Sequence, residues 1–207
     1  MYKHHPSLVL GFHACEREIG EDILCGEKGF KASENDFDWL GHGMYFWENS
    51  PHRAESYARE LKEVRKKLKN PIVIGAVINL GYCFDLLESH SLNVLKAQYD
   101  AMIKVYHAAN IEAPKNEAAY GKDIDRLLRK LDCAVFQFMH SEMKKNEEKA
   151  FDSVHGAFWE DSELYPSAGF KEKTTFKFVC GILIVSKDTF GLYYWMKAFL
   201  VSKSAFI

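Results

Sequence analysis

Five stretches of the chain space their apolar residues in the way that predicts β-strands. Residues 7–15 alternate apolar and polar side chains, and residues 71–80 form a continuous apolar run. Alternation is typical of a half-buried strand, whereas a short continuous run predicts a central strand buried on both faces. Residues 43–47, 151–159 and 176–185 predict three further short strands.

Four other stretches repeat their apolar residues at helical spacing. These are residues 16–26, 50–69, 89–109 and 122–145. The second starts at Ser50-Pro51, with Ser in the favoured N-cap position and Pro in the first turn. Residues 31–40 predict a polar loop, and residues 110–121 a linker or lid. Because short strands and helices alternate unevenly, the pattern predicts an α+β domain rather than a doubly wound sheet.

The length and charge of the chain narrow the class of protein. A chain of 207 residues fits one domain, and a formal net charge of -2 gives no overall basic field of the kind that binds nucleic acid. The charge is uneven, because residues 59–69 (RELKEVRKKLK) are strongly basic. Two interpretations of this run stay open: a solvated helix face, or a contact to a phosphate-bearing target.

The cysteines and the N-terminus indicate the compartment. The five cysteines are widely spaced without a CxxC pair, which predicts reduced thiols rather than disulfides or a zinc site. The first residues lack the apolar core and cleavage site of a secretion signal, and no apolar stretch reaches the about 18 residues of a membrane span. The pair His4-His5 has no Cys or carboxylate at ligand spacing. We therefore expect a cytoplasmic protein with no metal and no membrane partner.

Two short segments carry candidate chemistry. The segment GFHA places His13 near the end of the first predicted strand, and GHGMYFW at residues 41–47 is a glycine-rich turn into a strand that contains Tyr45. Taken alone, the first is explained by a core histidine and the second by a tight turn. The glycine run is not a dinucleotide-binding fingerprint, because the third glycine is missing and the run leads into a strand.

Taken together and in this order, these segments resemble the ADP-ribosyltransferase fold of the diphtheria-toxin and poly(ADP-ribose) polymerase type. The likeness also includes IL at residues 23–24, GF at residues 29–30, and a helix with Ala54 and Tyr57; it covers residues 9–58. A looser likeness to small bacterial members extends over residues 131–135, 152–156 and 165–173. The resemblance implies an α+β fold with a split β-sheet and helical insertions, whose cleft holds NAD in a bent shape.

The resemblance also implies roles for particular residues. His13 would bond the nicotinamide-side ribose or its neighbour, and Tyr45 would stack on the nicotinamide ring; these two are the predicted catalytic residues. The backbone of Ala14, where the family usually has Gly, would pair with the carboxamide. An aromatic clamp suits an oxocarbenium-like transition state, because it holds the leaving nicotinamide in the strained geometry. The predicted NAD-contacting residues are His13, Ala14, Trp39 (as an adenine platform), Gly43, Tyr45 and Tyr57.

The family's third catalytic residue, a Glu or a polar substitute such as Gln on a late strand, steadies the ribose and the developing positive charge. The carboxylates near the late strands are Glu160, Asp161, Glu163 and Glu172. None has an alternating strand context, so we expect surface charges in turns. His155 stands where the bacterial relatives have Arg. It is either a phosphate or target contact, or a surface residue.

The end of the chain departs from the rest in composition. Residues 174–207 contain a single acidic residue, Asp188. In the bacterial relatives a strand of the form NHIQICVRN follows the segment that matches residues 170–173. Codons compatible with the residues after this segment, read two bases later, encode NHIQICVR. We therefore hypothesise a frameshift near residue 173, which would replace the catalytic Gln by Lys177.

The alternative for this tail is a native fold. Residues 176–185 would form a strand, and residues 193–201 a closing helix packed on the core. In either case the predicted organisation is an ADP-ribosyltransferase-like domain at residues 1–173 and an apolar C-terminal tail at residues 174–207.

We expect the protein to transfer ADP-ribose from NAD to a macromolecule, with release of nicotinamide. NAD is then a substrate, and the acceptor, protein or nucleic acid, is not specified by the sequence. Two other functions stay open: an inactive relative that binds NAD or ADP-ribose without chemistry, and a toxin that hydrolyses NAD. The missing third residue favours the inactive relative.

Overall fold

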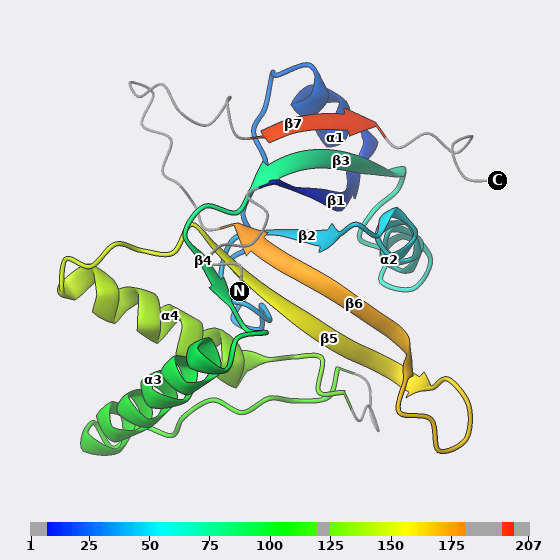
Figure 1. Cartoon of the computed structure of the whole chain (residues 1–207). Coiled ribbons are helices and arrows are strands. Elements are labelled where there is room, and N and C mark those ends of the chain that lie inside the picture. The colour runs from blue at the N-terminus through cyan, green and yellow to red at the C-terminus, as the bar shows by residue number, and fades with distance from the viewer. Residues whose placement is uncertain (1–7, 120–124, 181–195, 201–207) are drawn as a thin grey trace. The chain divides into compact units, whose positions relative to one another are not determined.

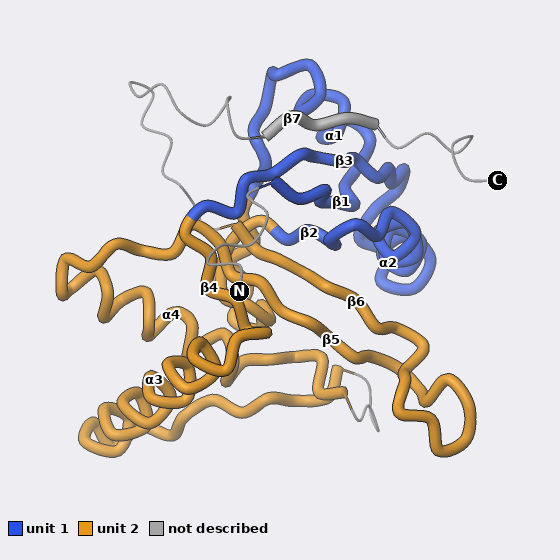
Figure 2. Tube along the Cα trace, viewed as in Figure 1, with its two compact units in different colours: residues 1–31, 45–81, 183–207 blue, residues 32–44, 82–182 orange. Residues whose placement is uncertain are grey.

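The computed structural model describes residues 8–119, 125–180 and 196–200, the last range by its backbone alone. The chain divides into two compact units (Figure 2). Unit 1 comprises Met1–Lys31, Tyr45–Gly81 and Leu183–Ile207, and unit 2 comprises Ala32–Met44 and Tyr82–Ile182. The described residues contain seven strands and four helices, which confirms the predicted mixture of α and β structure.

Unit 1 is built on antiparallel strands (Figure 1). In chain order they are β1 (Leu8–Glu16), β2 (Met44–Glu48), β3 (Pro71–Asn79) and β7 (Met196–Leu200). Their order in space is β2-β1-β3-β7. The apolar run of β3 is buried at most positions because it lies between two neighbours and carries helices on its faces.

Helices α1 (Arg17–Leu24) and α2 (Pro51–Glu63) complete unit 1. Each packs on a separate apolar cluster, and alternate residues of β1 and β3 belong to the two clusters. Phe12 and Val73 pack with Ala54 and Ala58 of α2, whereas Ile72 packs with residues that include α1 side chains. Successive side chains of a strand point to opposite faces. The two helices therefore cover opposite faces of the β1–β3 pair.

Unit 2 contains the remaining elements (Figure 1). These are β4 (Cys83–Asp85), α3 (Ser89–Ala108), α4 (Lys130–Lys145), β5 (Ser153–Glu163) and β6 (Lys171–Cys180). β5 pairs with β4 in parallel and with β6 in antiparallel orientation. Helices α3 and α4 pack on each other. None of the helices in the described part of the chain is long and apolar enough to cross a membrane.

Several predicted boundaries are wrong. Helix α2 ends at Glu63 rather than near residue 69, because the next residues fold back in a turn with Lys66 at a φ of 52°. Ser50 precedes α2 as predicted but makes no side-chain capping bond. Helix α4 begins at Lys130; residues 120–124, which include the start of the predicted helix 122–145, lie outside the described residues.

The late strands also differ from the prediction. β5 extends to Glu163, and β6 begins at Lys171 and runs through the predicted boundary at residue 173. The closing helix expected at residues 193–201 is wrong over residues 196–200, which form β7 and pair with the outer edge of β3. That pairing satisfies backbone groups that β3 would otherwise expose. His4-His5, and the part of the predicted strand 176–185 after Cys180, lie outside the described residues.

Candidate functional site

His13 lies on β1, paired with Ile74 of β3, and its ring is fixed by one hydrogen bond. Its Nδ1 is 2.8 Å from the backbone oxygen of Tyr45. A carbonyl oxygen only accepts, so Nδ1 carries the proton and donates it. Burial lowers the pKa of His13 below its usual value, against the opposing effect of the same hydrogen bond. The ring is therefore neutral near pH 7, with the lone pair on Nε2.

Two phenylalanine rings flank His13. The ring centres of Phe30 and Phe46 each lie 5.7 Å from that of His13, and 5.3 Å from each other. The sequence pattern included both residues only as parts of the family likeness. The contact of Phe46 with His13 depends on strand register, and that of Phe30 on the path of the loop after α1; the sequence gives neither.

The side chain of Tyr45 lies on the other face of the strand pair from His13. Phe46 contacts His13, whereas Trp47 belongs to the core against α2, so the alternation along β2 places Tyr45 on the α2 face. Tyr57 of α2 packs beside Trp47, with ring centres 4.9 Å apart. The structure thus joins His13 and Tyr45 through a backbone carbonyl, and not through two side chains on one face.

The backbone of Ala14 lies where the β1–β3 ladder continues but the β1–β2 register has ended. The register of β1 with β3 runs through to Glu16, but the register with β2 covers only Gly11 and Phe12. The Leu10 carbonyl accepts from the backbone N–H of Asn49, the residue after β2. In an antiparallel ladder every second residue of a strand turns its N–H and C=O toward the same neighbour, so the backbone groups of Ala14 also point to the β2 side. Ala14 is buried and lies past the last paired residue of β2.

Gly43, in unit 2, has a packing reason to be glycine. Its φ is 149°, and a Cβ there would lie 2.4 Å from the carbonyl oxygen of Cys180. Gly41 has a φ of 81°, and its Cβ would lie 2.9 Å from that of Phe136. The glycine-rich turn is therefore explained by close packing within unit 2, whatever ligand the protein binds.

Trp39, the predicted adenine platform, is fixed within unit 2. Its indole N–H donates to the Leu127 carbonyl at 2.8 Å. The Arg129 guanidinium lies 4.2 Å and the Lys177 ammonium 4.0 Å from the centre of its ring. These cation–π contacts occupy ring surface that an adenine would need, so stacking would require one cation to move. The adenine role stays a prediction.

The expectation that the late carboxylates are surface charges in turns is wrong for the most informative of them. Glu160 lies within β5, and its side chain is 11% exposed. Its carboxylate is 2.7 Å from the ammonium of Lys177, whose side chain is 12% exposed. Lys177 is the residue that stands in the predicted place of the catalytic Gln, so this position carries a buried ion pair.

The other candidates have separate surroundings. Asp161 and Glu163 end β5, and Glu172 lies on β6, all three exposed. Asp161 pairs with Lys173 at 2.7 Å, and Glu163 accepts from the backbone of Ser167 at 2.9 Å. These contacts are those of a strand end and a hairpin, with no sign of a catalytic group.

His155 is buried, so the interpretation as a surface residue is wrong. Only 4% of the residue is exposed, and its Nδ1 is 2.9 Å from the carboxylate of Asp85. Its ring stacks on Phe176, with centres 5.9 Å apart. A histidine buried in this way between β4 and β6 supports the sheet of unit 2.

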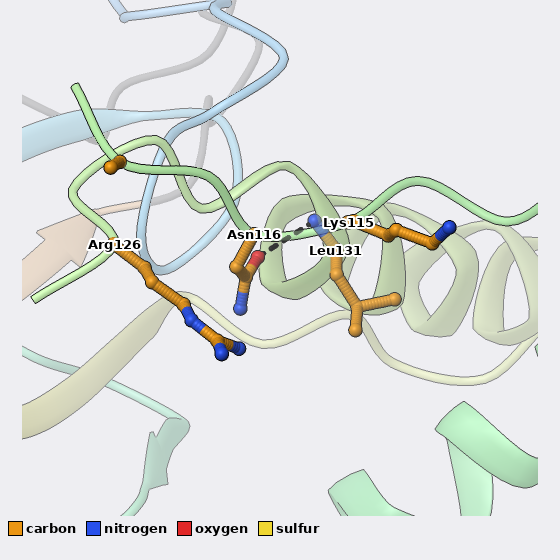
Figure 3. A pocket seen from close by; sticks show the side chains of 5 residues that line it. Lys115, Asn116, Arg126 and Leu131 are labelled. Atoms are coloured by element: carbon orange, nitrogen blue, oxygen red, sulfur yellow. Dashed lines mark hydrogen bonds between the residues drawn. The ribbon is translucent and has the colours of Figure 1, made fainter. Parts of the chain in front are cut away.

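Residues of unit 2 that the structure describes also line open pockets. One, of about 400 Å³, is lined by Lys115, Asn116, Ala118, Arg126 and Leu131 (Figure 3). Asn116 accepts from the backbone N–H of Leu131 at 2.9 Å and so caps the start of α4, and the Lys115 side chain extends away from Arg126. The other, of about 360 Å³, borders Trp39 and the leucines of α3.

The described residues contain no group of three His, Cys, Asp or Glu side chains arranged to hold a metal ion. Comparison of the chain with protein-family models, with curated proteins and with solved structures found no match.

Proposed function

We propose that the protein binds NAD at the end of β1 in unit 1 and transfers its ADP-ribose to a macromolecule. The observation that supports this most is the way the β1–β2 ladder ends. Past Phe12 the β1 backbone continues along β3 without a partner residue on β2, and the Tyr45 carbonyl accepts from His13 instead. A primary amide such as the nicotinamide carboxamide needs one acceptor and one donor, which the backbone of Ala14 has.

The protonation state of His13 fits the role of a ribose contact. With Nδ1–H given to Tyr45, a neutral His13 has an acceptor at Nε2, and a ribose hydroxyl is a donor. The ring is half-buried, contacts both Phe30 and Phe46, and is bonded to the Tyr45 carbonyl, so its orientation is set before ligand binds. A preset contact costs less ordering entropy on binding.

The reaction itself breaks the bond between the ribose C1′ and the nicotinamide nitrogen. Nicotinamide leaves with the electron pair, and a nucleophile of the acceptor attacks C1′ and loses its proton. The family's split-sheet fold belongs to the same proposal. The antiparallel pairs within each of the two compact units, and the end of the β1–β2 register at Phe12, support it.

A second candidate function is an NAD-binding module without turnover. It is favoured by Lys177, which stands in the predicted place of the catalytic Gln and is engaged with Glu160. In the family that the chain resembles, a Glu or Gln in this place steadies the positive charge that develops on the ribose, and a lysine does not supply that stabilisation.

Calorimetric titration with NAD, combined with chromatography of released nicotinamide, tests the proposal. The parent protein should bind NAD, and His13→Ala should weaken binding at least tenfold. His107→Ala, which changes an exposed histidine of α3, is the matched control and should bind like the parent. Binding without nicotinamide above a heat-killed control would favour the module, and absence of binding would contradict both functions.

A further inference from the structure

A basic surface lies on unit 1, at the end of α2 and in the turn that follows it. We define it by four exposed cations, Arg59, Lys62, Lys66 and Lys67. The opposite side of α2 is used by the core, where Ala54, Ala58 and Leu61 are buried. The four cations therefore belong to the side of α2 and its turn that faces solvent.

The turn that carries Lys66 and Lys67 is ordered by bonds on both sides. The backbone N–H of Lys67 donates to the Leu61 carbonyl at 2.8 Å, which folds the turn onto α2. The N–H groups of Lys69 and Asn70 donate to the carboxylate of Glu16 at 2.8 and 2.7 Å. These bonds lower the pKa of Glu16 and keep it ionised, so the anchor persists over a wide pH range.

Among the nearby acids Glu63 is exposed between Lys62 and Lys66, and the others are engaged with other groups. Glu60 pairs with Arg65 at 2.6 Å, Glu55 lies 3.7 Å from His52, and Glu16 holds the backbone of the turn. Within residues 8–119 and 125–180, none of the four cations of the basic surface forms an ion pair. Screening between exposed charges sets in only over about 8–10 Å at physiological salt, so neighbouring cations on one helix and its turn act together. The surface is therefore a local positive field on a chain whose net charge is -2.

The chemistry of the surface favours phosphates over other anionic partners. A stable protein partner would need an apolar centre of contact, and without apolar side chains to insert an anionic membrane surface would gain only about 1 kcal/mol per cation. The apolar side of α2 is buried, and Val64 is the exposed large apolar residue between Arg59 and Lys69. A nucleic-acid backbone needs cations alone.

We propose that the basic surface binds the phosphate backbone of double-stranded nucleic acid, without reading its sequence. The contact belongs to unit 1 alone, and it needs no NAD. It is thus independent of the proposed transfer reaction, and a failure of one leaves the other in place. If both hold, nucleic acid becomes the first acceptor to test.

Fluorescence anisotropy with a labelled 20-base-pair DNA duplex tests this proposal on the full chain, in buffers of increasing KCl. The test variant replaces Arg59, Lys62, Lys66 and Lys67 by Gln. The control replaces Lys96, Lys104, Lys144 and Lys145 of α3 and α4 by Gln, which changes the net charge equally in unit 2. Circular dichroism and melting temperature establish that both variants are folded. If the test variant does not fold, Lys62→Gln/Lys67→Gln takes its place, with Lys104→Gln/Lys144→Gln as its control.

Each phosphate contact contributes about 0.9 to the slope of log K against log salt. We expect the parent to show a slope of about -3 to -4, the test variant to lose most of it with at least a tenfold loss of affinity at low salt, and the control to keep it. Absence of binding by the parent, or equal losses in test variant and control, would overturn the proposal. Binding to phosphatidylserine vesicles with none to the duplex would overturn it as well.

Discussion

The imidazole of His13 donates from Nδ1 to the backbone oxygen of Tyr45, 2.8 Å away. This bond links β1 to β2 just past the point where their register ends at Phe12 and Trp47. It fixes the tautomer of His13 and uses the Tyr45 carbonyl at the place where the next ladder pair would form. Under the proposed function, the backbone donor and acceptor of Ala14, the next residue along β1, would pair with the nicotinamide carboxamide.

If this is the NAD site, His13→Ala and Tyr45→Ala should each lower turnover more than tenfold. The loss of one hydrogen bond or one ring contact should each cost about 1.5–3 kcal/mol of transition-state stabilisation. Nicotinamide release at saturating and at low NAD separates binding from chemistry. Parent-like kinetics in both variants would show that the site is assigned wrongly.

The structure makes a separate prediction for Tyr45, because its side chain lies on the α2 face. Tyr45→Phe keeps a ring for stacking and should behave like the parent in NAD titrations. If Tyr45→Ala also has parent-like affinity while His13→Ala does not, the nicotinamide contact lies on the His13 face, beside Phe46.

Protonation of His13 should make stability depend on pH. Its pKa is lowered in the folded protein, so on acidification the unfolded chain takes up this proton first, below the ordinary pKa of about 6.5. The contribution of His13 to the free energy of unfolding is therefore fully present above pH 6.5, and it is lost as the pH drops through and below that value. Burial lowers the pKa of His140 on α4 as well, so both histidines contribute.

Urea denaturation at pH 7.5, 6.5 and 5.5 checks this. His13→Gln keeps a donor for the Tyr45 carbonyl but cannot titrate, so its stability deficit against the parent should shrink toward pH 5.5. Gly169→Ala, which removes no titratable group, should differ from the parent by the same amount at each pH. A constant deficit for His13→Gln would contradict the lowered pKa.

Gly43→Ala should destabilise the protein by at least about 2 kcal/mol. The new Cβ would meet the Cys180 carbonyl oxygen at 2.4 Å, and a φ of 149° disfavours any side chain. Gly169→Ala is the matched control in the same unit, since nothing lies within 4 Å of its Cβ. Denaturation midpoints measure both, and equal midpoints for the two variants would refute the packing account of the glycine-rich turn.

Removing one partner of the buried Lys177–Glu160 ion pair should lower the free energy of unfolding more than replacing both partners by apolar residues. Lys177→Met removes the cation from a buried carboxylate, which typically destabilises a protein by about 3–5 kcal/mol. The double change Lys177→Met/Glu160→Leu should recover most of that loss, because no charge is left behind. If the double variant is as unstable as the single one, the pair is not the source of the effect.

Sequencing of the gene around codon 173 tests the frameshift hypothesis. The shifted frame should encode the Gln-containing strand NHIQICVR and continue to an in-frame stop. A shifted frame without that strand would mean that Lys177 is native, and that the native tail includes β6 and β7.

Local patterns predicted β1, β2 and β3 of unit 1, because β1 alternates apolar and polar residues and β3 is a continuous apolar run, but they predicted a helix where β7 lies. The end of β5 was missed for a physical reason. The stretch after Phe158 is polar at nearly every position, so Glu160 gives no alternating signal although it is buried. Its partner Lys177 lies across the antiparallel β5–β6 pair, a contact that depends on register.

The same limit applies to the candidate site. The sequence placed His13 on a strand and Tyr45 on another, and the structure has both strands. Which of Tyr45 and Phe46 shares a face with His13 follows from the pairing of Phe12 with Trp47, which no residue pattern specifies. The buried place of His155 beside Asp85 is likewise a contact between distant segments.

The most direct test of the proposed function is incubation of the protein with NAD labelled in its adenylate phosphate and a whole-cell extract. The products are then divided by protease and nuclease digestion, and released nicotinamide is measured in the same reaction. We predict label on a macromolecule, nicotinamide released in equal amount, and loss of both with His13→Ala but not with His107→Ala. Nicotinamide without macromolecular label would identify a hydrolase, and no nicotinamide above a heat-killed control would contradict the proposed transfer reaction.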